Sequence, residues 1–235
     1  MTILPCVALR TIAGAWDDLQ KEMEKENDIL KRVAYGLSAV LFPLFTPTYL
    51  MIVFCALFSQ YMLPLPARYW WFALGGTLLF TCILPFTVLI VMKMQGRISD
   101  LDVSNRRERL IPFLYSIMFF SLWCAYLDAV LKVPPFMFWT AVCSVLALVT
   151  CAIISHWWKI SAHLASMGGV MGMIIGYLLY FGLNAPVTVS LLLVLSLLLM
   201  YARIYLNAHT PEQTVCGFLL GLVFTLTPNI ILLYV

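Results

Sequence analysis

Three short polar segments carry most of the side chains that could do chemistry in this sequence. They cover residues 97–112, 159–163 and 203–213, and their candidate site residues are Arg106, Arg109, Lys159, Ser161, His163, Arg203, His209 and Gln213. Arginine binds phosphate oxygens through a planar fork, lysine binds them as a point charge, and a serine hydroxyl can donate a hydrogen bond. A neutral imidazole can attack phosphorus, and a protonated one can donate to the leaving oxygen near pH 7. These residue types therefore predict phosphate binding and phosphoryl transfer through a phosphohistidine, with no metal and no other cofactor.

The elements that must position these segments are membrane helices. Of the 235 residues, 63% are hydrophobic and only 11% are charged, far below the roughly 25% of a soluble domain. Seven apolar segments cover roughly residues 33–58, 69–92, 111–131, 133–155, 164–183, 185–202 and 214–235. Each is close to the ~20 residues that a helix needs to cross a bilayer. We expect an all-α, polytopic transmembrane helix bundle of about seven (six to seven) spanning helices over residues 33–235, after a polar interfacial segment over residues 1–32.

Turn residues and glycines refine this bundle. Lys132–Pro135 and Gly182–Pro186 predict two tight connections between consecutive helices. Pro43 and Pro47 predict a kink in the first apolar segment. Four glycines (Gly168, Gly169, Gly172 and Gly176) follow one stripe of the fifth segment, and this spacing lets a neighbouring helix approach closely.

Topology brings the three polar segments together. With seven crossings, the N-terminus and the connections after the second, fourth and sixth helices lie on one side of the membrane. That side holds every lysine and arginine except Arg68 and Lys132, so the positive-inside rule predicts that it is cytoplasmic. We expect a multi-pass protein of the cell (inner) membrane, with the lipid bilayer as its main partner and a candidate site on one membrane face.

Other classes of function find little support in the sequence. There is no dense basic stripe with interleaved aromatic residues, which argues against a nucleic-acid partner. There is no Cys-x-x-Cys pair, which argues against a zinc site or a redox site.

The second and third polar segments resemble the type 2 phosphatidic acid phosphatase superfamily. Its second and third motifs are Pro-Ser-Gly-His and Ser-Arg-x5-His-x3-Asp. Ser161-Ala162-His163 is similar to the second, with alanine for glycine, and Arg203 and His209 keep the Arg-x5-His spacing of the third. The resemblance implies a membrane-embedded, metal-independent phosphatase that hydrolyses a lipid phosphate or prenyl (pyro)phosphate. It implies that His209 is the nucleophile, that His163 is the general acid, and that Arg203 and Ser161 hold the phosphoryl oxygens.

Two positions depart from the family pattern. The first motif, Lys-x6-Arg-Pro, is incomplete, because Asp102 stands seven residues before Arg109 and proline follows only at residue 112. Arg106, Arg107 or Lys159 could supply the missing cation. The aspartate expected four residues after the nucleophile is Gln213. If the last helix begins there, the amide oxygen of Gln213 can accept the ring N–H of His209 and orient the ring.

Two other functions stay open on the sequence alone. A non-catalytic protein that binds or transports a lipid phosphate would explain Gln213 and the incomplete first motif. An intramembrane prenyltransferase would use Asp100 and Asp102, followed by Arg106 and Arg109, to bind magnesium diphosphate. That chemistry needs a second aspartate-rich loop, which the sequence lacks. Turnover would test the first alternative and magnesium dependence the second.

Overall fold

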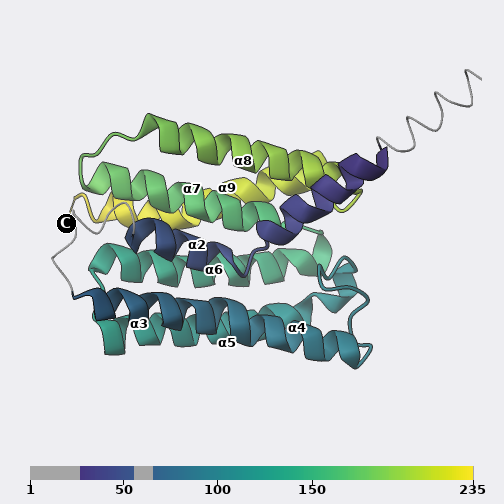
Figure 1. Ribbon diagram of the computed structural model, residues 1–235, viewed down its shortest axis with the longest axis horizontal. Coiled ribbons are helices and arrows are strands. Elements are labelled where there is room, and N and C mark those ends of the chain that lie inside the picture. Colours follow the sequence, from purple (N-terminus) through teal and green to yellow (C-terminus); the bar gives the residue numbers. More distant parts are fainter. Residues whose placement is uncertain (1–26, 56–65, 235) are drawn as a thin grey trace, which may run out of the picture.

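The computed structural model describes residues 27–55 and 66–234, and all regular structure within them is helical. Most of the expected interfacial segment, residues 1–26, lies outside the described residues. A helix over residues 27–40 comes first. The elements that follow it are α2 (Thr46–Val53), α3 (Ala67–Thr77), α4 (Leu84–Met94), α5 (Leu110–Tyr126), α6 (Pro135–Trp157), α7 (Ala162–Tyr180), α8 (Pro186–Tyr205) and α9 (Pro211–Ile231) (Figure 1).

Six helices of the described chain are long and apolar enough to cross a membrane. They are Arg68–Met94, in which a π-helical turn joins α3 to α4, Leu110–Leu131, Pro135–Trp157, Ala162–Tyr180, Pro186–Tyr205 and Pro211–Ile231. Their outer faces expose large apolar side chains such as Leu114, Leu191 and Val223. Such surfaces are stable against lipid and not against water. The chain is therefore a multi-pass helical membrane protein.

The first expected crossing is not one continuous helix. The helix over residues 27–40 ends before Pro43, and α2 begins three residues after this proline, with Pro47 in its first turn. Proline cannot donate a backbone hydrogen bond inside a helix but is well accommodated in a first turn. The expected kink is thus a complete break, and the last residues of the expected segment, 56–58, lie outside the described part of the chain.

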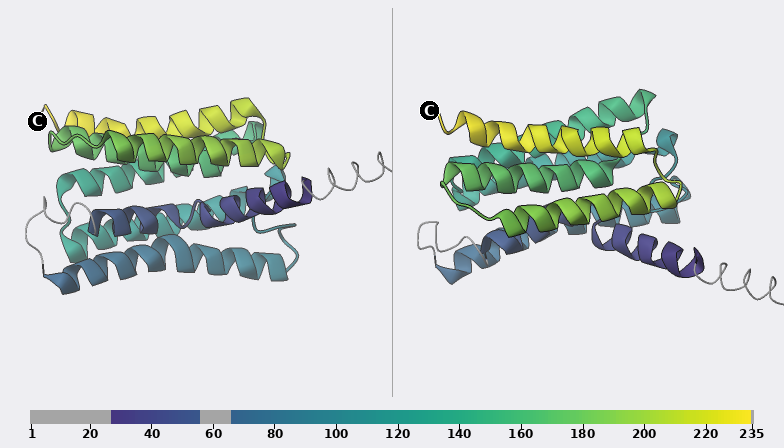
Figure 2. Two further views of the ribbon diagram at one scale, coloured as in Figure 1. Left: turned by 45° about the horizontal axis from the view of Figure 1, so that its top comes forward. Right: turned by 90° about the horizontal axis from the view of Figure 1, so that it is seen from above.

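The long helices lie side by side, and their order in space decides where the polar connections meet. α8 lies at one edge, followed by α7 with α9, then α6, then α5 with α3 and α4 (Figure 1). The connections 95–109, 158–161 and 206–210 gather at the same end of the bundle, where the helix over residues 27–40 also lies (Figures 1 and 2).

At the opposite end, the part of the chain that the structure describes includes the two tight turns that the sequence predicts. Lys132 adopts a left-handed conformation with φ of 52°, and α6 begins at Pro135. Gly182 has φ of 62°, and α8 begins at Pro186. Both helices therefore start with the N-terminal proline that their sequences provide.

The glycine stripe of α7 does bring a neighbouring helix close, and that neighbour is α9. A Cβ atom added to Gly168 would lie 1.9 Å from the carbonyl oxygen of Phe218, and one added to Gly221 would lie 1.8 Å from that of Ala165. No side chain fits there, so the two backbones are in direct contact. This α7–α9 seam fixes the start of α7 relative to the start of α9, and the two site histidines lie at these starts.

Candidate functional site

Direct contacts join the polar connections at one end of the bundle, as the topology predicts. The Nη1 atom of Arg109 donates to the carbonyl oxygen of Ile160 at 2.8 Å. The Nδ1 atom of His209 lies 3.2 Å from the carbonyl oxygen of Lys159. The backbone N–H of Ser161 donates to the carbonyl oxygen of Gln213 at 3.2 Å. Residues far apart in the sequence thus form one site.

A pocket lies between these connections. Its polar lining combines a carboxylate, two guanidinium groups and two imidazoles, from Asp102, Arg109, His163, Arg203 and His209. Its other walls are largely apolar, from residues such as Phe42, Pro43, Leu44 and Phe113. A few convergent polar groups in an apolar pocket are typical of a ligand site.

Arg203, near the end of α8, is the most deeply buried charge of the site. Its residue is only 1% exposed, and its Nη1 atom lies 2.7 Å from the Oδ2 atom of Asp102. This is the one ion pair within residues 27–55 and 66–234. The Nε atom of Arg203 is buried and has no hydrogen-bond partner in the same residues. A buried donor without a partner is costly, so this guanidinium has capacity for a further acceptor.

Arg109 places a second guanidinium in the same pocket. Its Nε donates to the carbonyl oxygen of Val103 at 2.9 Å, and Nη1 donates to that of Ile160. Both acceptors are neutral, so the positive charge of Arg109 is not cancelled by them. Burial, followed by the nearby charge of Arg203, lowers the pKa of the Arg109 guanidinium to about 10. It still carries its charge at neutral pH, and the pocket holds more positive than negative charge.

The connection 95–109 is held in shape by its own polar groups and presents Asp102 to Arg203. The Glu108 carboxylate accepts from the backbone N–H and hydroxyl of Ser99, and the Asp100 carboxylate accepts from Ser104. Val103, directly after Asp102, has φ of 48°. This left-handed conformation is strained for a β-branched residue. Strain next to the carboxylate that pairs with Arg203 is consistent with a connection that is shaped for function.

His209 lies just before α9, and the helix start orients its ring. Thr210 is the N-cap, its hydroxyl accepts from the backbone N–H of Gln213, and the Gln213 side chain accepts from the backbone N–H of Thr210. The same Gln213 Oε1 atom lies 3.0 Å from Nδ1 of His209. Two oxygen acceptors, Gln213 Oε1 and Lys159 O, therefore face Nδ1 and favour the tautomer that carries its proton there. The lone pair of the neutral ring is then on Nε2.

The surroundings of His209 favour the neutral ring. Burial, then the charge of Arg109, lowers the pKa of the His209 imidazole to about 4, while the Gln213 contact acts in the opposite direction. Desolvation and neighbouring cations both disfavour imidazolium. At neutral pH this imidazole is therefore uncharged, and Nε2 carries a lone pair instead of a proton.

His163 comes from the first turn of α7 and is held by the N-terminal region of the described chain. Its Nε2 atom lies 3.2 Å from the carbonyl oxygen of Ser38, and its ring meets that of Phe42 edge-on with 5.5 Å between centroids. The carbonyl oxygen of Ser38 can only accept a hydrogen bond, so Nε2 of His163 is the donor and carries a proton. Two neighbours from residues 38–42 thus fix the orientation of this histidine.

The other predicted site residues lie at different distances from the pocket. The hydroxyl of Ser161 accepts from the backbone N–H of Leu164 as the N-cap of α7, and Ser161 does not line the pocket. Arg106 is exposed and donates to the carbonyl oxygen of His156 at 2.8 Å, away from the pocket. Lys159 is half-buried, and burial followed by the charges of Arg109 and Arg203 lowers its pKa. Of these three residues, Lys159 is the one whose pKa is lowered by the charges of the two pocket arginines.

Sequence reasoning missed three contacts of the site. The sequence places Asp102 where the family pattern has a lysine, and as a possible magnesium diphosphate ligand, whereas the structure pairs it with Arg203. The contacts of His163 with Ser38 and Phe42 had no signal in the sequence, because both residues lie in an ordinary apolar stretch. Asp102 shares its segment with Asp100 and Glu108, so the sequence does not single out the carboxylate that pairs with Arg203.

Comparisons with known proteins add no relative to this picture. Neither the protein-family models, nor the curated proteins, nor the solved structures include a match to the chain.

Proposed function

We propose that this protein is a lipid phosphate phosphatase of the cell (inner) membrane, which works through a phosphohistidine on His209. The observation that carries the proposal is the buried charge of the pocket. Arg203 and Arg109 are both buried there, and within the described chain a single carboxylate, that of Asp102, forms an ion pair, which it makes with Arg203. A buried cation without a partner is unfavourable, and a phosphate group supplies the missing negative charge in a form that guanidinium groups bind well.

The proposed reaction uses groups that line the pocket. Nε2 of His209 attacks phosphorus, a P–N bond forms, and the P–O bond to the lipid alcohol breaks. His163, in its protonated form, gives a proton to the leaving oxygen and becomes neutral. A water molecule then attacks the phosphohistidine and gives a proton to His163, the P–N bond breaks, and inorganic phosphate is released. Arg203 and Arg109 stabilise the charge on the phosphoryl oxygens, the role that a metal ion has in other phosphatases. The resemblance of Ser161-Ala162-His163 and of the Arg203–His209 spacing to the type 2 phosphatidic acid phosphatases supports the same roles.

Phosphate release from a panel of lipid monophosphates and diphosphates in detergent tests this function. We expect release that continues in EDTA, because side chains carry the positive charge of the site. Complete loss of release in EDTA would contradict the mechanism. Release that His156→Ala preserves and His209→Ala abolishes would link activity to the pocket, since His156 is exposed and packs on Trp157.

The distribution of cations supports a cytoplasmic site. Reporter fusions at residues 105, 160 and 208 should therefore all report the cytoplasmic side. A periplasmic signal from all three would keep the shared site but reverse the orientation.

A second candidate function is binding of a lipid phosphate without turnover. Two observations favour it: Asp102 already occupies one side of the Arg203 guanidinium, and Gln213 brings no negative charge to His209. Such a protein would bind alkyl phosphonates and lipid phosphates with similar affinity and release no phosphate from either.

A further inference from the structure

A second, apolar chamber lies deeper in the bundle than the polar pocket. Residues 43–54, α5, α6, α7 and α9 all contribute to its walls. Along α6 and α7 the lining residues recur every three or four positions, and most of them are small: Ala141, Ser144, Ala147, Ala162, Ala165, Ser166 and Gly169. Each helix therefore turns one stripe of short side chains toward the chamber, and the space between them stays unfilled.

The chamber and the polar pocket adjoin each other and share part of their walls. Pro43, Leu44, Leu148 and Ala162 line both of them. Ala162 directly precedes the histidine of α7, so the chamber begins beside the site. A ligand with a charged group at Arg203 and an apolar group attached to it would extend into the chamber.

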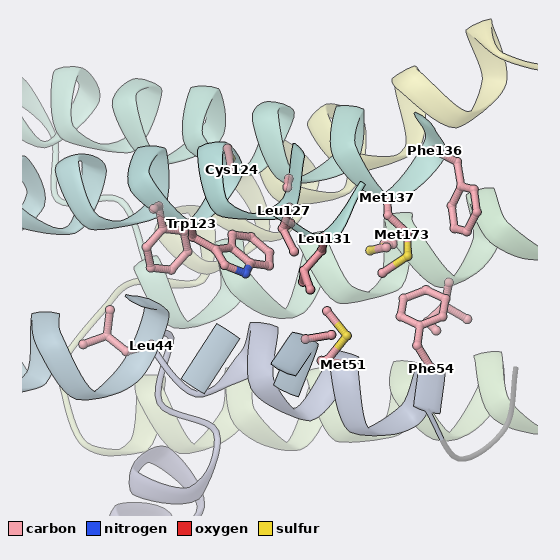
Figure 3. Close-up of a cluster of buried hydrophobic side chains, with 14 of the residues drawn as sticks. Leu44, Met51, Phe54, Trp123, Cys124, Leu127, Leu131, Phe136, Met137 and Met173 are labelled. Carbon is pink, nitrogen blue, oxygen red and sulfur yellow. The ribbon is translucent and has the colours of Figure 1, made fainter. Parts of the chain in front are cut away.

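Large side chains close the other end of the chamber. Phe54, Met137 and Met173 line it there. In Figure 3, Met51 and Phe54 point from one side toward Met137 and Met173. Behind them, the rings of Phe54 and Phe136 pack on Tyr177, with centroids 5.1 and 5.6 Å from its own. An apolar chain that enters beside the site meets this wall.

The length of the chamber follows from the helix that lines it. Cys151 lies near the polar pocket and Met137 at the closed end, roughly 21 Å apart along α6 at about 1.5 Å per residue. One leaflet of a bilayer contributes about 15 Å of hydrocarbon. The chamber is therefore long enough for the extended chain of an ordinary membrane lipid, but too short for a long polyprenyl chain.

We propose that this chamber binds the hydrocarbon chain of the substrate and limits its length to about that of an extended hexadecyl chain. The proposal rests on the proposed function for the nature of the headgroup. It makes the substrate a lipid phosphate with a chain of membrane-lipid length, and it excludes a long polyprenyl (pyro)phosphate. The chain leaves one apolar environment, the bilayer, for another, so the chamber selects by length and shape instead of by hydrophobicity.

Photo-labelling locates the chain without requiring turnover. The probes are alkyl phosphonates that carry a diazirine on the last carbon, in octyl and hexadecyl lengths, and labelled positions are read by mass spectrometry. We expect the hexadecyl probe to label Met137, Met173 or Phe54, and the octyl probe to label residues nearer the pocket, such as Leu148. Labelling confined to the lipid-facing side chains Leu146 and Ile153, or no labelling at all, would overturn the proposal.

Two substitutions of increasing depth sharpen this test. Ala147→Phe fills the chamber near the site, and Ala141→Phe fills it closer to the closed end. We expect Ala147→Phe to reduce hexadecyl labelling at least about tenfold relative to octyl labelling, a difference of ~1.4 kcal/mol. Ala141→Phe should shorten the longest accepted chain by less. Ala125→Phe, at an exposed position of α5, is the matched control and should change neither probe.

The outcomes separate this proposal from the proposed function. Chain-end labelling of the closed end without phosphate release from any lipid phosphate would keep the chamber and reject the phosphatase. Phosphate release with labelling on lipid-facing side chains would keep the phosphatase and reject the chamber. Equal labelling of Ala147→Phe and Ala125→Phe by the hexadecyl probe would also reject it.

Discussion

Two neighbouring faces of α7 carry small residues, yet one is in direct contact with the backbone of α9 and the other lines the apolar chamber. Gly168 and Gly172 lie against the backbone of α9, where a Cβ atom would have no room. Ala165 and Ser166, one turn away, line the apolar chamber. The tight face fixes the helix starts that carry the two histidines, and the open face leaves space for a chain beside them. One helix thus combines a rigid site with access for a ligand.

Opening the tight face should have the largest effect. A Cβ atom in Gly221→Ala would lie 1.8 Å from the carbonyl oxygen of Ala165, so the α7–α9 seam must separate. We expect a loss of about 1–3 kcal/mol in the free energy of unfolding, together with loss of phosphate release. Thermal unfolding in detergent measures the first effect.

Gly75→Ala is the matched control for this substitution. Nothing lies within 4 Å of a Cβ atom at Gly75, and alanine is the better helix former. It should be neutral or slightly stabilising. Equal melting temperatures for the two variants would show that the backbones of α7 and α9 are not in close contact at Gly221.

The second prediction concerns the polar pocket, where the Asp102 carboxylate competes with the substrate for the Arg203 guanidinium. Asp102→Asn removes the negative charge that lies 2.7 Å from Nη1. We expect alkyl phosphonates to bind about tenfold more tightly, equal to ~1.4 kcal/mol, and to stabilise this variant more than the natural protein. Titration with the phosphonate in detergent measures both.

Asp100→Asn serves as the control, because the Asp100 carboxylate bonds Ser104 within its own connection. Its phosphonate affinity should stay near that of the natural protein. Weaker binding by Asp102→Asn than by Asp100→Asn would show that Asp102 supports the anion site instead of occupying it.

The third and smallest expected effect is a shift in the pH dependence of the reaction rate, caused by a substitution in the first turn of α9. His209 must be neutral to attack, and its low pKa, about 4, keeps it neutral in mildly acidic solution. Gln213→Asp places an anion beside Nδ1, which raises the histidine pKa by about one unit or more. The acid limb of the pH–rate profile should therefore move to higher pH. Gln213→Asn, which adds no charge, should leave it in place, and an equal shift in both variants would contradict this reading.

The sequence predicts those features of the site that depend on local spacing. His209 and Gln213 are four residues apart around a helix start, and their side chains do meet. The convergence of the three polar connections follows from helix count and parity. Glycines at regular spacing predict a close helix neighbour, although not that the neighbour is α9.

Features that depend on distant pairs were not predictable in the same way. Asp102 and Arg203 lie 101 residues apart in the sequence, and the residue after Asp102, Val103, has a left-handed conformation that the sequence does not signal. The break between residue 40 and α2, which brings Ser38 and Phe42 to His163, was expected only as a kink. Hydropathy does not separate Ala147, which lines the chamber, from Ala125, which faces outward, because both surfaces are apolar.

The central claim is that His209 becomes phosphorylated by a lipid phosphate in this pocket. The most direct measurement is to mix the protein with the hexadecyl phosphate, stop the reaction in alkaline denaturant, which preserves phosphohistidine, and locate the added phosphate by mass spectrometry. The account predicts phosphate on His209, none in His209→Ala, and unchanged labelling in His156→Ala. Phosphate release from the natural protein with no phosphate on His209, or release that persists in His209→Ala, would contradict it.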